Sequence, residues 1–552
     1  MSATFERPRV VRGVALGVTI AVLGSLGTAV GWSSHPVGDD SHPVFTPRHK
    51  ACFGDPPRQS EDPLAPPCVP FFDGHNGGAT SRGVTRDQVS VVLYNDLGLE
   101  GDLSSPYRTD QEMPGHEAST NGEQTYLVRT TKALVRFFAN HYQTYTRSIR
   151  VIAVPSSGGV GTPCASRKVE AAVINRDYRP FAATTLGDDM NCFASEMASF
   201  GVPTFGAGRD VYDESSTEDE MAWTFHPSLA DATAASAAFV CDKLQGSRAR
   251  YSPDPVLAMA PRRFALLYPV NSQRGPTSAI AAGGLVQDLG ARCGLEPGDA
   301  ADEIYVRGYI SGGQAEATNI FLDLKLKGIT TVICYCVPVA NELTVSTFQS
   351  TATTLRYFPE WYWDTASRMY RAPWQRQHGS RSQVSFGITP DWAGGRAEER
   401  YGWRAYREIQ PGTMPNARFV DDIYHSLLVL FSAIQLSGPD LTPSNAATGL
   451  RTLAMRTGSP YVADGGFEAS KGPDAFAFRD RYLSFWWDPF GQEPGRSRDG
   501  CLRSGLEVGS ADGWISGDVG VVGGGTCLGS PMQVPAATKA VLDLIPLPWS
   551  AS

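Results

Sequence analysis

Two cysteines, Cys334 and Cys336, stand one residue apart in the apolar stretch KGITTVICYCVP, Lys327 to Pro338. Cysteines at short spacing can bind a metal or form a redox centre. In a strand, however, residues two apart point to the same face, one rung apart, which places them poorly for bonding to each other. No further Cys or His pair nearby completes a metal set. The stretch is β-branched and almost uncharged, as is typical of a strand buried on both faces, so we predict that both cysteines pack in a core.

A second candidate for chemistry is SSGGVGT, Ser156 to Thr162, which follows a predicted strand and resembles a phosphate cradle. It lacks the G-x-G-x-x-G order and has no acidic residue placed for a ribose, so a glycine-rich turn between strand and helix is the better interpretation. The motifs G-x-x-x-x-G-K-[ST], G-x-S-x-G, H-E-x-x-H and C-x-x-C are absent. The sequence therefore predicts no cofactor, no metal site and no familiar class of enzyme.

Composition excludes one class of partner. The 552 residues carry a net charge of −9 and a pI near 5.6, with no block of basic residues interleaved with aromatics. Binding to phosphate backbones needs clustered Lys and Arg, so nucleic acid is not an expected partner. Hydrophobic residues make up 42%, enough for a sizeable core, and we expect a monomer.

The N-terminus is typical of an export signal. Arg7, Arg9 and Arg12 precede the uncharged stretch Gly13–Trp32. As a helix, these 20 residues would span about 30 Å, enough for a membrane core. A small-residue cleavage site at Ala29–Gly31 is the alternative. A cleaved signal peptide and a retained signal anchor both remain open, and either places the bulk of the chain outside the cytoplasm, secreted or tethered to the membrane.

Ten cysteines in an exported chain favour disulfides over catalysis or metal binding. Two pairs bracket short Pro-rich or Gly-rich segments, and two further pairs are guesses, because connectivity does not follow from sequence. The expected pairs are Cys52–Cys68, Cys501–Cys527, Cys164–Cys192 and Cys241–Cys293.

Strands and helices alternate along the chain in two successive series, which predicts α/β architecture with parallel sheets covered on both faces. We expect two Rossmann-like lobes joined by a hinge. The expected boundaries are 1–32 for the signal, 33–82 for a Pro-rich linker, 83–227 for lobe 1 with roughly 390–455 returning to it, 228–389 for lobe 2 with roughly 456–500 returning to it, and 501–552 for a Gly-rich, loop-like tail. In such sheets, ligands lie beyond the carboxyl ends of the strands, and two facing sheets form a cleft that a hinge can close.

Several segments, in this order, give the chain a family resemblance. GVTRDQVSVVLYND resembles the opening of type I periplasmic binding proteins of the leucine/amide-binding branch, which are solute receptors of ABC importers. Actinobacterial members have a similar cysteine-bracketed leader (ACFGDPPRQSEDPLAPPCVPFFDGHNGGAT), a similar run LKGITTVICYCVPVANELTVSTFQSTATTLRYFPEW, a later FGITP, and a helix like VDDIYHSLLVLFSAI. The resemblance covers roughly residues 50 to 530.

The resemblance implies a ligand held between two lobes without a cofactor, and an ABC permease as membrane partner. It also implies ligand-binding positions on loops that follow strands of both lobes. These positions are Ser156, Ser157, Thr184, Thr185, Gly206, Ala207, Asn271 and Ser311. Family ligands are amino acids, amides or short carboxylates. Here Asp188 and Asp189 stand close to the third strand and would repel a carboxylate, which leaves a cationic or neutral polyhydroxy ligand as the alternative.

The sequence thus predicts an extracytoplasmic protein that captures a small polar solute for an ABC importer and is not an enzyme. Two alternatives stay open. One is a sensor domain with the same fold and no transport. The other is an exported α/β hydrolase in which Asp188 or Asp189 acts with Ser156 or His226.

Overall fold

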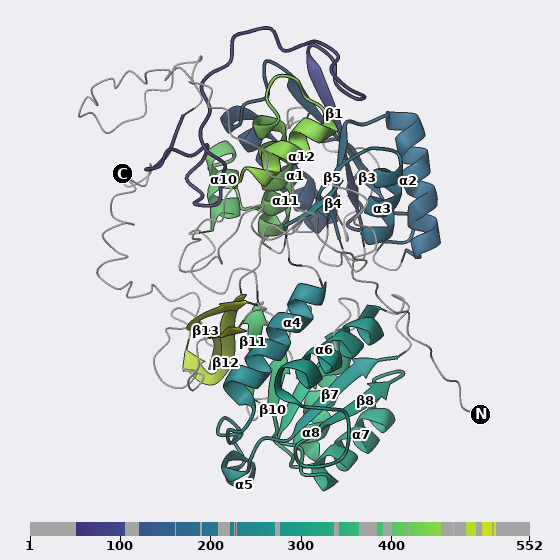
Figure 1. Ribbon diagram of the computed structural model, residues 1–552, viewed down its shortest axis with the longest axis vertical. Helices are drawn as coiled ribbons and strands as arrows, with labels where there is room; N and C mark the ends of the chain where they lie inside the picture. The colour runs from purple at the N-terminus through teal and green to yellow at the C-terminus, as the bar shows by residue number, and fades with distance from the viewer. Residues whose placement is uncertain are drawn as a thin grey trace, which may run out of the picture. The chain divides into compact units, whose positions relative to one another are not determined.

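The computed structural model describes two α/β lobes, each built on its own sheet (Figure 1). The residues that it describes are 51–104, 121–159, 162–187, 190–207, 221–225, 227, 229–270, 277–335, 342–363, 384–389, 400–417, 419–453, 467, 482–492, 499–510 and 513–514. The expected signal, 1–32, lies outside them. Among these described residues, no helix is both long and apolar enough to cross a membrane.

Lobe 1 is built on a six-stranded sheet with the order β2-β3-β1-β4-β5-β6, parallel except for β2. Its strands are β1 (Gln88–Asn95), β2 (Gly101–Asp102), β3 (Ser148–Pro155), β4 (Ala182–Leu186), β5 (Thr204–Ala207) and β6 (Ala222–Thr224). Its helices are α1 (Asn121–His141), α2 (Cys164–Tyr178), α3 (Asn191–Ser199), α10 (Tyr401–Ile409), α11 (Val420–Leu436) and α12 (Pro443–Arg451).

Both faces of this sheet are covered. One apolar cluster joins the sheet to α1 and α11, and another joins it to α2 and α3 (Figure 1). Leu134 and Phe138 of α1, and Leu427 and Phe431 of α11, lie four residues apart on the buried faces of their helices. A central strand such as β1 is therefore buried almost along its whole length.

Lobe 2 is built on an eight-stranded sheet with the order β14-β13-β12-β11-β10-β9-β7-β8. Its strands are β7 (Phe264–Pro269), β8 (Ile304–Tyr309), β9 (Thr331–Cys334), β10 (Glu360–Trp363), β11 (Val384–Thr389), β12 (Tyr482–Gln492), β13 (Asp499–Ser510) and β14 (Gly513–Trp514). Its helices are α4 (Leu229–Phe239), continued by a π-helical turn at Val240–Leu244, then α5 (Pro255–Met259), α6 (Thr277–Cys293), α7 (Gln314–Leu326) and α8 (Glu342–Thr354). One cluster packs α4 and α6 on the sheet, and a second packs α7 and α8.

The prediction of two helix-covered sheets is confirmed, but lobe 2 is not wholly parallel. Strands β7 to β11 are parallel, whereas β12, β13 and β14 continue the sheet antiparallel. β13 begins at Asp499 and ends at Ser510. The expected loop-like tail from 501 is therefore wrong over its first ten residues, 501–510. Its glycines obscured the alternation of Leu502, Leu506 and Val508, which is the period-two signal of a strand.

The segment expected as a solvated linker is also folded over its described part, 51–82. Leu64 and Ala65 are buried in it. Two amides tie it to lobe 1, because Gln59 donates to the His141 carbonyl at 2.6 Å and Gln435 donates to the Pro67 carbonyl at 2.9 Å. Within the segment, short antiparallel bridges pair Arg58 with Phe53 and with Pro67, so backbone and side-chain hydrogen bonds together hold it in place.

The structure contains three of the expected disulfides: Cys52–Cys68, Cys164–Cys192 and Cys241–Cys293. Cys527 lies outside the described residues, so Cys501–Cys527 stays a prediction. Cys334 is buried in β9, as expected, but it is also disulfide-bonded, which corrects the prediction that it only packs. Its partner side chain lies outside the described residues, as does Cys336.

Candidate functional site

The loops that follow β1 and β3 form the best-defined polar site of lobe 1. Both strands are parallel, so the chain leaves them at the same edge of the sheet, called here the C-terminal edge. Asn95 fixes the first turn, because its side-chain oxygen accepts the Leu97 and Leu99 N–H groups at 3.1 and 2.8 Å. Its amide nitrogen donates to the Leu99 carbonyl at 2.9 Å. The sequence signal for this turn was the polar Asn95-Asp96 pair that ends an apolar run.

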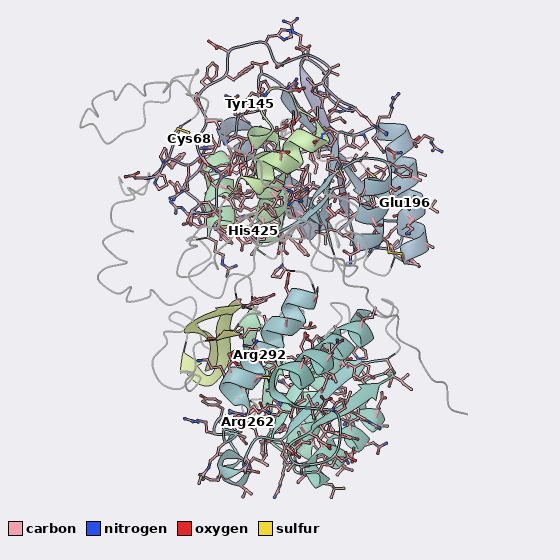
Figure 2. The ribbon with its side chains drawn as sticks, viewed as in Figure 1. Cys68, Tyr145, Glu196, Arg262, Arg292 and His425 are labelled. Atoms are coloured by element: carbon pink, nitrogen blue, oxygen red, sulfur yellow. A yellow bond between two sulfur atoms is a disulfide. The ribbon has the colours of Figure 1, made fainter. Side chains whose placement is uncertain are left out.

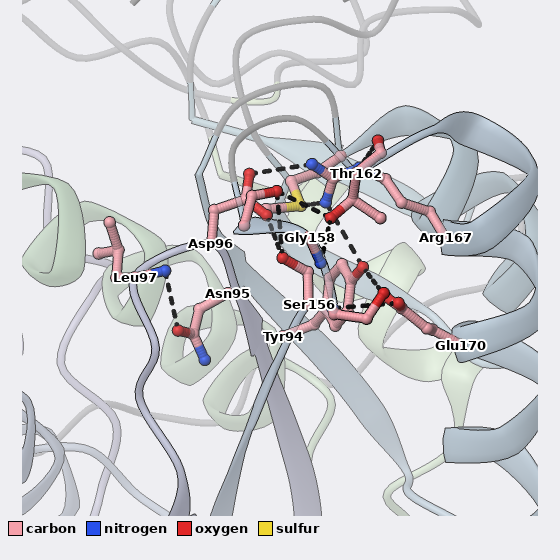
Figure 3. A network of polar contacts seen from close by, with 12 residues as sticks. Tyr94, Asn95, Asp96, Leu97, Ser156, Gly158, Thr162, Arg167 and Glu170 are labelled. Carbon is pink, nitrogen blue, oxygen red and sulfur yellow. Dashed lines mark hydrogen bonds and ion pairs between the residues drawn. The ribbon is translucent and has the colours of Figure 1, made fainter. Parts of the chain in front are cut away.

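A buried ion pair lies directly behind these loops. Arg167 of α2 donates through Nη2 to Asp96 Oδ2 at 3.0 Å, and the two side chains are 1% and 0% exposed (Figure 3). The Ser156 hydroxyl donates to the other carboxylate oxygen, Asp96 Oδ1, at 2.6 Å. Arg167 Nε also donates to the Thr162 carbonyl at 3.2 Å. The pair therefore links α2 to the turn after β1 and to the loop Ser156–Gly159.

Position 187, directly after β4 at the same edge, must be a glycine because the Asp96 side chain lies against it. The φ of Gly187 is +147°, and a Cβ there would lie 2.7 Å from Asp96 Oδ2 and 2.4 Å from Met190 Cε. Only a residue without a side chain can approach the carboxylate so closely. The ends of β1, β3 and β4 thus meet around Asp96.

A second carboxylate, Glu170 of α2, closes the loop after β3. Glu170 Oε1 accepts the Ser157 N–H at 3.1 Å, and Oε2 accepts the Tyr94 hydroxyl (Figure 3). Burial, followed by the hydrogen bond to Glu170, raises the pKa of Tyr94 well above its ordinary value, so this hydroxyl stays a donor. The Gly158 N–H donates to Thr162 Oγ1 at 3.0 Å.

An aromatic pair lies beyond β6 at the C-terminal edge of lobe 1. His425 of α11, labelled in Figure 2, stacks on Phe225 with ring centroids 3.9 Å apart and an interplanar angle of 11°. Phe225 is buried, whereas His425 is partly exposed. No motif in the sequence pointed to this pair, because it joins residues that are distant along the chain.

At the C-terminal edge of lobe 2, the loop after β8 surrounds a carboxylate of its own helix. Glu316 of α7 accepts the N–H groups of Ile310, Ser311 and Gly312 at 2.7 to 2.9 Å. The Ser311 hydroxyl donates to the same side chain at 3.0 Å. Glu316 was not among the residues singled out from the sequence, although a Glu in the first turn of a helix is the usual signal for such capping.

Of the ligand-binding residues that the resemblance implied, some lie at the C-terminal edges of the sheets, some lie inside lobe 1, and one lies outside the described residues. Ser156 and Ser157 lie at the C-terminal edge of lobe 1, and Ser311 lies at that of lobe 2. Ser156 is largely buried with its hydroxyl on Asp96, while Ser157 and Ser311 are exposed. Asn271 lies outside the described residues. Ser157 and Ser311 are therefore the two implied side chains that the structure places at an edge with exposure to solvent.

The remaining implied residues lie inside lobe 1. Thr184 and Thr185 are buried within β4 rather than after it. Thr185 Oγ1 donates to the Gly206 carbonyl at 3.2 Å. Gly206 is also buried, in β5, and Ala207 ends that strand with a side chain outside the described set. These positions came from the resemblance, which implied loops after the strands, and threonine suits both a strand and a ligand loop.

Substituting Gly206 tests its packing role. Gly206 has φ +71°, and a Cβ would lie 2.6 Å from the Cα of Ser426 in α11. We expect Gly206→Ala to lower the free energy of unfolding by about 2–4 kcal/mol, from left-handed strain plus overpacking. Gly201→Ala is the control, because Gly201 has φ +69° and no atom within 4 Å of its Cβ position. It should cost about 1–2 kcal/mol in urea denaturation, and equal effects of the two substitutions would contradict the packing role.

Three of the four residues named for a hydrolase, Asp188, Asp189 and His226, lie outside the described residues. Ser156, the remaining member, holds its proton toward Asp96, which already pairs with Arg167. Within the described part of the chain, no group of three His, Cys, Asp or Glu side chains is arranged to hold a metal.

Neither a protein-family model nor a curated protein matches this chain. Solved structures do match. A solute-binding protein of an ABC transporter from Rhodopseudomonas palustris HaA2, in complex with p-hydroxybenzoic acid, is 9% identical with a TM-score of 0.50 over 77% of this chain and 98% of its own. An ABC transporter substrate-binding protein from Desulfitobacterium hafniense, in complex with Leu, is 11% identical with a TM-score of 0.48 over 76% and 100%.

The first of these matches carries the fold assignment. At 9% identity, it speaks to architecture and not to ligand. This chain has the type I periplasmic-binding fold, as the order of its segments predicted, and it is similar in structure to solute-binding proteins of ABC transporters.

Proposed function

We propose that this protein is an extracytoplasmic solute-binding protein, not an enzyme. It captures a small polar solute (an amino acid, an amide or a similar compound) between its two lobes and presents it to an ABC permease. It acts as a monomer, outside the cytoplasm, either secreted or tethered by its N-terminal segment.

The observation that supports this proposal most strongly is the pair of loops at the C-terminal edges of the two sheets. In lobe 1, the loop Ser156–Gly159 is held from behind by Asp96 and Arg167. In lobe 2, the loop Ile310–Gly312 is held by Glu316. Open α/β sheets bind ligands at this edge, and a site works best when buried contacts fix its loops in advance.

The test is a thermal-shift screen of the purified chain without its N-terminal 32 residues, against amino acids, amides, sugars, amines and small acids. A ligand that binds only the folded state at 100 times its Kd stabilises that state by about 2.7 kcal/mol. We expect at least one class to raise the Tm and to be recovered unchanged after incubation. The proposal would be contradicted if the protein converted one of the compounds and none of them stabilised it unchanged.

The affinity of the protein for this solute should fall when the hydrogen bonds that hold the loop Ser156–Gly159 are removed. Thr162 is buried, and its Oγ1 accepts the Gly158 N–H and donates to the Gly159 carbonyl at 2.8 Å, so it shapes the loop from inside the lobe. Thr162→Val is expected to weaken binding in titration calorimetry. Thr318→Val in α7 is the control, because Thr318 only back-bonds to the Gln314 carbonyl at 2.8 Å and should leave the Kd unchanged.

A further inference from the structure

The loop after β8 is a complete carboxylate-binding site that the chain fills itself. Ile310 N–H donates to Glu316 Oε1 at 2.7 Å. The N–H groups of Ser311 and Gly312 donate to Oε2 at 2.8 and 2.9 Å, and the Ser311 hydroxyl adds a fourth bond. Four donors on one carboxylate satisfy most of its hydrogen-bonding capacity.

The donors stay engaged at neutral pH because Glu316 stays ionised. Burial raises the pKa of Glu316, but the backbone hydrogen bonds from Ile310, Ser311 and Gly312 outweigh it and hold the pKa below the ordinary value of 4.5. The N-terminus of α7 adds favourable dipole interaction with a negative charge. An incoming anion would have to displace this carboxylate and would be repelled by it.

Lobe 1 has the corresponding arrangement at the loop after β3. The Ser157 N–H donates to Glu170, and the Ser156 hydroxyl donates to Asp96. Among the described contacts of this loop, the cation is Arg167, and it is already paired with Asp96 at 3.0 Å. The two lobes share no sequence motif here, yet in each a Glu from the following helix accepts from the loop: Glu170 takes one N–H in lobe 1, and Glu316 takes four donors in lobe 2.

Building on the solute-binding function proposed above, we propose that Glu170 and Glu316 set the charge class of the solute. Their carboxylates occupy the loop donors that would otherwise receive an anionic group. The protein therefore binds a neutral or cationic polar solute and discriminates against free carboxylates, which favours amides over amino acids among the solutes proposed above.

Acetate tests whether Glu316 fills a carboxylate site. Glu316→Ala removes the carboxylate and leaves its donors unpaired, so the Tm should fall. Acetate should then raise the Tm of this variant more than chloride does at the same ionic strength, and it should not raise that of the wild type. Glu303→Ala is the control, because Glu303 caps the Ala300 N–H at 2.7 Å ahead of β8, at the opposite end of the strand. It should show no such rescue.

A milder variant keeps the test usable if Glu316→Ala does not fold. Glu316→Gln removes the charge, and it replaces one carboxylate oxygen with an NH2 group, which cannot accept from the N–H groups of the loop. Because the folded-state pKa of Glu316 is depressed, its contribution is complete above 4.5 and lost as the pH falls through the lower folded-state value. The Tm advantage of wild type over Glu316→Gln should therefore be full at neutral pH and shrink below pH 4.5. A difference that does not change with pH would overturn the role of Glu316.

The screen of solute classes then separates the two proposals. Stabilisation by neutral amides, polyols or amines, and not by matched carboxylates, supports the inference. A carboxylate that stabilises the wild type best, or acetate that stabilises wild type and Glu316→Ala equally, would overturn it and leave the solute-binding function intact. If no class stabilises the protein, the solute-binding function itself fails, while acetate rescue still decides what Glu316 does.

Discussion

Arg167→Met is expected to lower the free energy of unfolding by about 3–5 kcal/mol, because it leaves a buried carboxylate without its cation. Asp96 is 0% exposed, and in the variant it keeps the hydrogen bond from the Ser156 hydroxyl but loses the Arg167 cation. Methionine approximates the length of the arginine stem, so packing is largely retained and the loss reports on the charge. Urea denaturation followed by tryptophan fluorescence measures it.

The matched control lies on the same helix. Arg176 pairs with Asp177 at 2.6 Å, but the two side chains are 72% and 46% exposed. Arg176→Met should therefore leave stability unchanged within error, since solvent screens an exposed pair. The double variant Asp96→Leu with Arg167→Met should recover part of the loss, because no unpaired charge remains. If Arg167→Met behaves like Arg176→Met, the pair does not organise the edge of lobe 1.

Glu360→Leu is expected to cost a similar amount, about 3–5 kcal/mol, in lobe 2. Glu360 is 0% exposed and holds Arg262 through two bonds, Nε to Oε2 at 2.8 Å and Nη2 to Oε1 at 3.1 Å. It also accepts the Tyr251 N–H and the Thr331 hydroxyl, each at 2.9 Å. Removing it leaves a buried guanidinium without its carboxylate and takes an acceptor away from two more donors.

This second pair differs from the first in its place on the sheet. Glu360 begins β10 and Thr331 begins β9, so the pair lies where strands start, away from the C-terminal edge. Glu360→Leu should therefore reduce stability without changing the Kd for the solute at a temperature where the variant is folded. Asp299→Ala, which breaks an exposed pair with Lys327, is the control and should change neither quantity. A large loss of affinity in Glu360→Leu would contradict the assignment of the site to the other edge.

Most of the fold could be predicted from local patterns. The apolar runs at β1, β9 and β10 and the periodic face of α11 are strong signals, because strands and helices buried on both sides must be apolar at fixed spacing. β13 was missed because glycines diluted its alternation. The disulfide at Cys334 was missed because disulfide connectivity does not follow from sequence.

The candidate site was predicted less well. Ser157 and Ser311 follow strands in the sequence and do lie at the C-terminal edges. The resemblance implied loop positions for Thr184 and Gly206, but both are buried in strands, because a family pattern does not fix where each strand of this chain ends. Asp96 with Arg167, and Glu316 with its loop, depend on hydrogen bonds that no spacing rule anticipates. A charge in a helix first turn, as at Glu316, was the one available signal.

The most direct test of the solute-binding account is a crystal structure of the protein with the compound that stabilises it best in the thermal-shift screen. We predict electron density for that compound against the loops Ser156–Gly159 and Ile310–Gly312, with Glu170 and Glu316 still bonded to their own loops. Density at the edge where the strands begin, near Glu360, or a solute carboxylate in place of the Glu316 side chain, would contradict it.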